Sequence, residues 1–278
     1  LYQPESLWIV HSARQDIEAL YYLSKRLPVQ LFDTQIAASL LNHPAQISYQ
    51  ALTEHLQGVY LEKAYTRLDW TTRPLPEAAI EYALDDVRYL LKNYTQLETQ
   101  LTKENKSLWI KEEGEYLSDI DLYRPNIQDA WKKTKGISRL AKKTHTLAMQ
   151  LSAWREHQAI DKNKPRKWII SDEKLINYTL KKEKLSSKAK NSFDDFLNKH
   201  PELVQPGFVI EQAKIPTKTE KAKKNELQKL IQNTANQYNL DDTVLANGKA
   251  LLSFIRGDQS VIFLKGWRYH ILKEELEK

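Results

Sequence analysis

The chain has no cysteine, one methionine and only seven glycines among its 278 residues. Without cysteine there is no disulfide, no thiolate metal site and no thiol nucleophile, which fits a reducing cytoplasm. The glycines form no glycine-rich loop, so a phosphate-loop enzyme is excluded, and no nucleophile elbow of a serine hydrolase is present. The seven histidines show no zinc-ligand spacing. No apolar run approaches the roughly 20 residues that a membrane helix needs, so we expect no membrane association.

Charge is present in abundance but is unevenly distributed. The net charge is +6, yet residues 1–110 carry 10 basic and 13 acidic side chains. Residues 131–224 carry 23 basic and 10 acidic side chains. An acidic first part and a basic middle suit an enzyme that binds metal ions at one end and a polyanion along the rest. A lysine-rich solvated surface explains the same composition, and composition alone does not separate the two.

The first hundred residues show an alternation of strand and helix patterns. Leu7–Val10 is a short apolar run typical of a buried strand, and a helix follows it. Asp33 stands where it would cap a helix over residues 34–41, and Tyr49–Gln57 predicts a helix that ends at Gly58. One helix is predicted from Pro76 to about Leu101. Its expected core positions are Ile80, Ala83, Val87, Leu90 and Leu91.

The rest of the chain is predicted to be helical. Residues 109–143 are charged and contain short helical stretches, so we interpret them as a linker. Thr146–Asn163 is a strongly amphipathic helix. Two further helices reach Leu203, and residues 204–219 resemble a second connection. The last sixty residues are helical again. These patterns divide the chain into residues 1–108, 109–143, 144–204 and 217–278.

Two carboxylates and a phenol stand where chemistry is possible. Asp16 lies in the first turn of a helix that follows a buried strand, at the rim where α/β folds place ligands. Tyr82 and Asp86 are four residues apart and share one helix face. Carboxylates bind hard cations such as Mg²⁺ or Mn²⁺, and a phenol hydroxyl can orient a water. The alternative is structural: Asp16 would favour its helix dipole, and Tyr82–Asp86 would be a surface pair.

Five segments occur together in the order of a known family. They are His11–Asp16, Phe32–Ala38, Thr66–Trp70, Arg73–Leu75 and Tyr82–Val87. Together they resemble the second half of the exonuclease domain of the ribonuclease D family. The family motif H-x4-D falls on His11 and Asp16, and the motif Y-x3-D falls on Tyr82 and Asp86.

The resemblance implies a mechanism and a fold. It implies two divalent metal ions per site, Mg²⁺ or Mn²⁺, with Asp86 as ligand of the first and Asp16 supporting the second. It also implies that Tyr82 positions the attacking water. Asp85 is out of phase with the motif and is expected to be a bystander. The implied fold is an α/β ribonuclease H-like exonuclease domain, N-terminally incomplete, followed by two all-α HRDC-type domains.

The family's D-x-E motif has no counterpart among these 278 residues. Glu5 is the sole acidic residue before Asp16, and it is not in a D-x-E context. We therefore expect either a longer parent chain, which we favour, or a catalytically inactive remnant that binds nucleic acid.

The second part resembles the HRDC domain over residues 144–204, on Leu151–Glu156 and Trp168–Glu173. The tail resembles a second such domain, on Ala250–Phe254 and Leu264–Arg268. We expect the nucleic-acid contacts to include His11 and a basic patch of Arg155, Lys162, Lys164, Arg166 and Lys167. The alternative is that these are ordinary helix-surface charges, with Trp154 and Trp168 in the core.

The resemblance predicts a monomeric cytoplasmic 3′→5′ exoribonuclease that trims the 3′ ends of tRNA precursors and other small RNAs. A DNA 3′→5′ exonuclease is an alternative, because the same metal chemistry hydrolyses either backbone. Two further alternatives are a non-catalytic protein that binds nucleic acid and a module that only mediates interactions.

Overall fold

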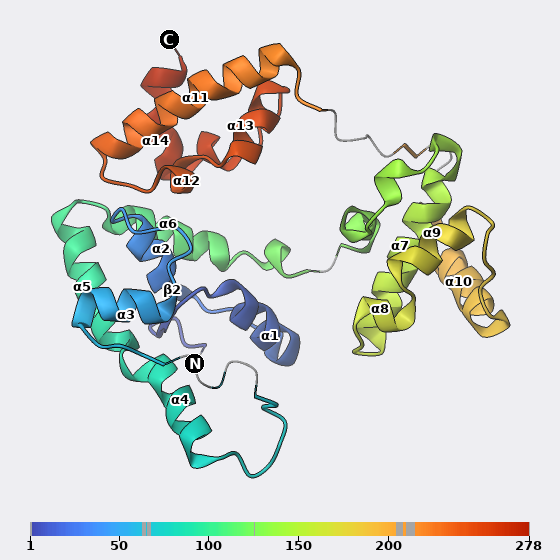
Figure 1. The fold of residues 1–278 in the computed structure, drawn as a ribbon, viewed down its shortest axis with the longest axis horizontal. Coiled ribbons are helices and arrows are strands. Elements are labelled where there is room, and N and C mark those ends of the chain that lie inside the picture. The colour runs from blue at the N-terminus through green and yellow to red at the C-terminus, as the bar shows by residue number, and fades with distance from the viewer. Residues whose placement is uncertain are drawn as a thin grey trace. The chain divides into compact units, whose positions relative to one another are not determined.

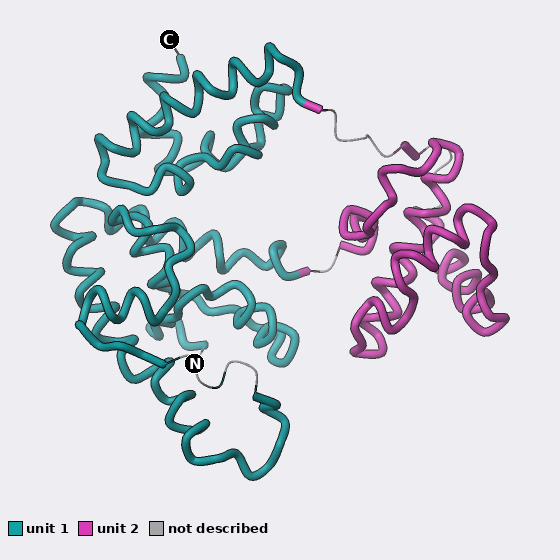
Figure 2. Tube along the Cα trace, viewed as in Figure 1, with its two compact units in different colours: residues 1–123, 216–278 teal, residues 124–215 magenta. Residues whose placement is uncertain are grey.

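The computed structural model describes residues 2–62, 65, 68–124, 126–203, 208–209 and 215–277. It forms two compact units (Figure 2): residues 1–123 with 216–278, and residues 124–215. Thr66 and Arg67 of the family segment, and most of the expected connection over residues 204–219, lie outside the described residues.

The first unit begins with a strand–helix–strand motif (Figure 1). Strand β1 (Leu7–Val10) pairs in parallel with β2 (Gln30–Asp33), in a register that places Leu7 opposite Gln30. Helix α1 (Arg14–Ser24) connects them and buries Ile17. The predicted strand is confirmed, and so is Asp33 as the cap of α2 (Thr34–Ser39), since its side chain accepts from the N–H of Gln35. The predicted helix α3 (Tyr49–Gln57) ends at Gly58, whose φ of 68° suits glycine.

The prediction of one helix from Pro76 to Leu101 is wrong. The structure has two, α4 (Glu77–Arg88) and α5 (Leu90–Lys103), separated at Tyr89. The expected core stripe is also wrong for most of its members, because Ile80, Val87 and Leu91 are 45%, 60% and 64% exposed. The apolar spacing picked out these side chains, but no described element covers Ile80 and Val87 on α4 or Leu91 on α5. Helix α5 is anchored instead by Leu97 and Leu101, which are buried.

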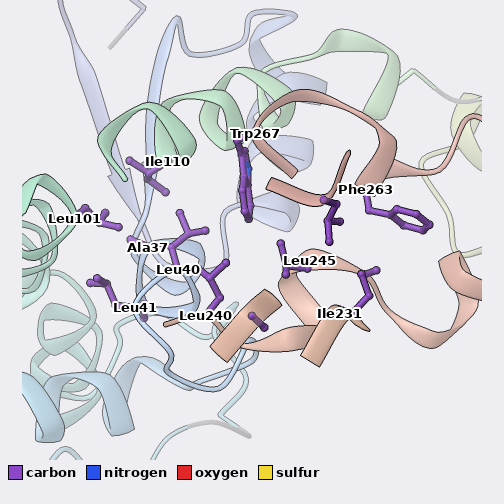
Figure 3. Close-up of a cluster of buried hydrophobic side chains, with 14 of the residues drawn as sticks. Ala37, Leu40, Leu41, Leu101, Ile110, Ile231, Leu240, Leu245, Phe263 and Trp267 are labelled. Atoms are coloured by element: carbon purple, nitrogen blue, oxygen red, sulfur yellow. The ribbon is translucent and has the colours of Figure 1, made fainter. Parts of the chain in front are cut away.

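Helix α6 (Ser107–Leu117) lies across β2 and contributes to a core shared with the C-terminal helices. These are α11 (Lys218–Gln237), α12 (Asp242–Leu245), α13 (Gly248–Ile255) and α14 (Gly266–Leu276), with the 3₁₀ helix η6 (Ile262–Leu264) before α14. Figure 3 shows Leu40 next to Leu240 of the C-terminal segment, in one cluster of buried side chains that also includes Leu101, Ile110, Leu245 and Trp267. Residues 216–278 therefore complete the core that residues 1–123 begin.

Polar contacts fasten the same two segments together. Lys106 is buried, and its ammonium group donates to the carbonyls of Leu40 (2.7 Å) and Asn239 (3.0 Å). The buried carboxylate of Glu113 accepts from Trp267 Nε1 (2.7 Å) and pairs with Arg268. A buried charge that lacked such partners would be strongly destabilising. The buried Lys106 and Glu113 therefore require the C-terminal segment to pack where it does.

The second unit is all-helical and is built around α7 (His145–Asp161). Its other α-helices are α8 (Arg166–Ile169), α9 (Asp172–Thr179) and α10 (Ser187–Lys199), and its 3₁₀ helices are η2 (Ile127–Lys133), η3 (Ile137–Arg139), η4 (Lys142–Thr144) and η5 (Pro201–Leu203). Trp154, Leu175 and Phe193 lie in its core. Trp154 is buried as the structural alternative expected, but Trp168 is 75% exposed, so that alternative is wrong for Trp168.

The residues expected to form a linker, 109–143, are divided between the units. Helix α6 lies in the first unit, and a 3₁₀ helix η1 (Ile120–Leu122) follows it there. Helix η2 packs along α7, and Ile137 and Leu140 are buried near it. The domain boundaries at 108, 143, 204 and 217 stay predictions. Among the described residues, no helix is long and apolar enough to cross a membrane.

Candidate active site

The candidate site lies where β1 and β2 end. The buried Asp33, the last residue of β2, accepts hydrogen bonds from the N–H groups of Ser12 (3.0 Å), Ala13 (2.8 Å) and Gln35 (2.8 Å). One carboxylate therefore joins the start of α1 to the start of α2. Asp16 projects from the first turn of α1. Partial desolvation raises the pKa of Asp16, and the nearby charge of Asp33 raises it further.

His11 lies between the same two strand ends. Its Nε2 donates to the carbonyl oxygen of Ile47 (3.1 Å), because a carbonyl can only accept. Its Nδ1 lies 3.0 Å from Thr34 Oγ1. Burial lowers the pKa of His11, and the charges of Asp33 and Asp86 and the Ile47 bond oppose that shift. Both ring nitrogens thus have protein partners, and the role visible here is to hold the segment before α3 against β1.

Helix α4 is attached to this region through Tyr49. The buried Tyr49 hydroxyl donates to the carbonyl oxygen of Asp85 (3.0 Å), and its ring lies 5.6 Å from that of His11. Burial raises the pKa of Tyr49 to about 12. The bond brings the end of α4 next to the end of β1. Sequence reasoning missed Tyr49, since a tyrosine at a helix start carries no signal of such a contact.

Asp86 and Tyr82 lie on this anchored helix. Desolvation raises the pKa of Asp86, the neighbouring Asp85 raises it further, and His11 lowers it. Burial, followed by the charge of Asp86, raises the pKa of Tyr82. The Tyr82 ring also contacts Trp70, with 6.2 Å between ring centroids. The charge of Asp86 therefore raises the pKa of both Tyr82 and His11, and the charge of Asp33 raises the pKa of both His11 and Asp16.

The donor set suits a hard cation but is small. Among the described residues, neither Asp16 nor Asp86 has a cationic partner, and both are exposed, so their oxygens are accessible to a cation. The described part of the chain holds no group of three or more acidic or histidine side chains placed to bind a metal ion. Carboxylate oxygens are the ligands that Mg²⁺ and Mn²⁺ prefer, and these ions commonly retain several waters.

The five basic residues of the expected patch lie in the second unit, but they differ in burial. Arg155 is 2% exposed, and its guanidinium donates to Asp172 (2.6 Å) and Thr134 Oγ1 (2.9 Å). Lys162 is exposed and donates to Gln158, and Lys164 and Lys167 are exposed. Arg166 Nε lies 3.4 Å from Glu156 Oε2. Arg155 therefore belongs to a buried network, whereas the other four reach the surface.

Comparisons with known proteins agree with this fold. A model of a 3′–5′ exonuclease family matches residues 1–102. Ribonuclease D of Bartonella henselae is 33% identical over 97% of this chain and 71% of its own length. Ribonuclease D of Sphingobium indicum is 38% identical over 62% of this chain, and the match spans 44% of that protein.

A solved structure extends the likeness over the whole chain. The crystal structure of Escherichia coli ribonuclease D, described as an exoribonuclease involved in structured RNA processing, has a TM-score of 0.81. It is 20% identical, and the match covers all of this chain and 80% of that one, which shows the shared fold. The N-terminal part is thus an exonuclease domain of the 3′–5′ class, followed by a mostly helical region. The chain belongs to the ribonuclease D family.

Proposed function

We propose that this protein is a 3′→5′ exoribonuclease that hydrolyses phosphodiester bonds with two divalent metal ions, Mg²⁺ or Mn²⁺. Asp86 and Asp16 would be metal ligands, and Tyr82 would position the attacking water. The observation that carries the proposal is the bond from the Tyr49 hydroxyl to the Asp85 carbonyl (3.0 Å), with the Tyr49 ring 5.6 Å from that of His11. These contacts support a shared site in which Asp86 on α4 lies near the strand ends that also bear Asp16.

The residues have complementary tasks. Bound divalent ions would supply charge stabilisation for the attacking and leaving oxygens. Asp86 and Asp16 are carboxylates that lack cationic partners among the described residues, and 3′–5′ exonucleases of this family are typically metal-dependent. The Tyr82 hydroxyl, like any tyrosine hydroxyl, is protonated at neutral pH, so it can donate one hydrogen bond to a phosphate oxygen and accept another from a water. Asp33 and Tyr49 hold the helices that bear these groups.

The substrate class follows from the family. We propose that the RNAs are tRNA precursors and other small RNAs, processed from their 3′ ends by a monomer in the bacterial cytoplasm. We also propose that residues 144–204 and 217–278 are HRDC-type domains, which their helical structure supports. Hydrolysis of a matched DNA strand at the rate of the RNA would favour the DNA exonuclease instead.

The decisive variant is Asp86→Asn in the full-length protein. We expect Mn²⁺-dependent hydrolysis of a 3′-labelled RNA to fall by about 1,000-fold or more, because a ligand of the reacting centre is lost. RNA binding in EDTA should be unchanged. Asp85→Asn is the matched control, because Asp85 is paired with Arg88 at 2.7 Å on the same turn of α4.

A second measurement separates a lost metal from a lost fold. Addition of Mn²⁺ should raise the thermal unfolding midpoint of the parent protein, since a ligand that binds the folded state stabilises it. The rise should shrink in Asp86→Asn and persist in Asp85→Asn. Unchanged turnover in Asp86→Asn would refute this site, and a parent protein that binds RNA without hydrolysing it would be a binding remnant.

A further inference from the structure

Helix α3 carries three polar side chains on one face. Tyr49, Thr53 and Gln57 follow one another at intervals of four residues, so they lie one above the other along the helix. This polar ridge faces the junction between α4 and α5, because Tyr49 and Gln57 donate to the carbonyl oxygens of Asp85 (3.0 Å) and Tyr89 (2.9 Å). Helix α3 lies beside α5 (Figure 1).

The inner part of the polar ridge is a chain of hydrogen bonds between side chains. Gln57 Nε2 also donates to Asn93 Oδ1 (2.7 Å), and Asn93 Nδ2 donates to Thr53 Oγ1 (2.9 Å). Because the carbonyl oxygen of Tyr89 can only accept, it requires the nitrogen of Gln57 to face it, and this orients the Asn93 amide in turn. Thr53 and Asn93 are fully buried. A buried network of this kind specifies one arrangement, since any other leaves a polar group without a partner.

The polar ridge meets α4 and α5 where the helical path breaks. The N–H of Tyr89 bonds to the carbonyl oxygen of Val87, and the carbonyl oxygen of Asp85 accepts the Tyr49 hydroxyl. Helices bend sharply where a side chain enters their ladder of backbone bonds. The ridge therefore accounts for a break that neither proline nor glycine marks.

Helix α4 has little apolar packing to fix its direction. Ala79 is the one buried residue among the twelve of α4, all of which the structure describes. The apolar side chains Ile80, Leu84 and Val87 are exposed. Packing of an apolar face is what normally holds a helix on its unit. The direction of α4 therefore depends on the polar contacts at its C-terminal end, where it meets the ridge.

The candidate site is sensitive to the angle at this junction. Tyr82 and Asp86 precede Tyr89 by seven and three residues. Seven residues of helix span about 10 Å, so a tilt of about 10° at Tyr89 would move Tyr82 by about 2 Å. A displacement of about 1 Å in a reacting group can lower a rate by about 100-fold.

We propose that Gln57 and Asn93 are positioning residues for hydrolysis. By fixing the junction at Tyr89 they hold Asp86 and Tyr82 at the strand ends, and they act only through the direction of α4. Both lie outside the five segments that resemble the family. The effect on hydrolysis rests on the proposed function, whereas the fixed direction of α4 does not.

The first test is Mn²⁺-dependent single-turnover hydrolysis of a 3′-labelled RNA by Gln57→Met. This variant keeps the length of the side chain and removes both of its donated bonds. We expect the maximal rate to fall by about 10–100-fold, with KM for RNA within about twofold, because the reacting groups move while the surface that binds RNA stays. Gln100→Met, the same change at an exposed position of α5, is the matched control and should keep the parent rate. A parent rate in Gln57→Met would overturn the proposal.

A double variant separates positioning from stability. Gln57→Met/Asn93→Leu replaces both amides by apolar side chains, so no amide is left buried without its partner. The urea midpoint should recover most of what Gln57→Met lost, while the rate of hydrolysis stays low. If the rate recovers together with the midpoint, the polar ridge serves stability alone and neither residue positions the site.

The last measurement needs no catalysis. The 278 residues contain no cysteine, so Ala19→Cys on α1 and Ala78→Cys on α4, both exposed, can each take one nitroxide label. Ala78 lies about 16 Å along the helix from Tyr89, so a 10° tilt should shift or broaden the label distance by about 3 Å in Gln57→Met. An unchanged distance distribution would overturn the proposal even where hydrolysis proceeds. A parent protein that does not hydrolyse RNA, with a distance that still changes, would remove the exonuclease proposal and leave the fixed direction of α4 standing.

Discussion

At the scale of single residues, Asp33 shows how one side chain determines the placement of others. Its carboxylate accepts three backbone N–H groups from the starts of two helices, which is why it is buried although charged. Its charge also raises the pKa of Asp16. The sequence identified Asp33 as a helix cap, which is confirmed. Its bonds to Ser12 and Ala13 could not be foreseen, because they join residues about twenty positions apart.

Asp16 should destabilise the metal-free protein when ionised. Its pKa is raised in the folded state by desolvation and by Asp33, so the stability it contributes is present below the unfolded pKa and is lost as pH rises through the folded pKa. We expect Asp16→Asn to raise the urea midpoint of the metal-free chain at pH 7 and to change it little at pH 3. Glu18→Gln, exposed on the same helix, is the control. A lower midpoint at pH 7 would contradict the shift.

Tyr82 offers a test at the level of one oxygen atom. Tyr82→Phe removes the hydroxyl and keeps the ring, including its contact with Trp70. We expect hydrolysis of RNA to slow by about 10–100-fold, the lower range for a positioned proton-handling group, while the stabilisation by Mn²⁺ is retained. Single-turnover rates and Mn²⁺ titrations measure the two effects. Equal rates would remove the assigned role from Tyr82.

At the scale of elements, Gly114 determines how closely α6 approaches the sheet. A Cβ atom at this position would lie 2.2 Å from the backbone oxygen of Leu31 in β2. Glycine to alanine inside a helix usually stabilises by about 1 kcal/mol. Here we expect Gly114→Ala to destabilise by about 2 kcal/mol, because the backbone must move. Urea unfolding measures it, and Glu115→Ala on the exposed face of α6 controls for helix propensity.

The elements also show where local pattern is sufficient and where it is not. The sequence predicted β1, α3 and α7 closely, because their apolar periodicity and their end signals, such as Gly58, agree. The same periodicity marked Ile80, Val87 and Leu91 as core, yet they are exposed, since a spacing identifies a face without identifying what covers it. The break at Tyr89 has no proline or glycine to signal it.

Some residues of the candidate site could be predicted from the sequence, and others could not. Asp16, Tyr82 and Asp86 could be selected because family motifs place them at fixed spacings, and their catalytic roles stay predictions. Tyr49 could not be selected, because it matters through its contacts with Asp85 and His11, which are distant in the sequence. Trp168 resembled a core residue by type, and only its surroundings show that it faces solvent.

At the scale of the whole molecule, the first unit depends on a contact between distant parts of the chain. Glu113 on α6 is buried, accepts from Trp267 and pairs with Arg268 on α14. We expect Glu113→Gln to destabilise by about 3 kcal/mol, because it leaves the Arg268 charge poorly compensated. Urea unfolding and hydrogen exchange across α14 measure the loss. Glu115→Gln, two residues further along, should have almost no effect.

The order of the segments has a consequence for synthesis on the ribosome. The core begun by Leu40, Leu101 and Ile110 is completed by Leu245, Trp267 and Leu272, which emerge after residues 124–215 have already left the exit tunnel. Domains generally fold as units in the order in which they are made. The inserted helical unit can therefore finish folding before the last helices of the exonuclease part have been made. A nascent chain halted before α14 exposes an apolar surface that chaperones recognise.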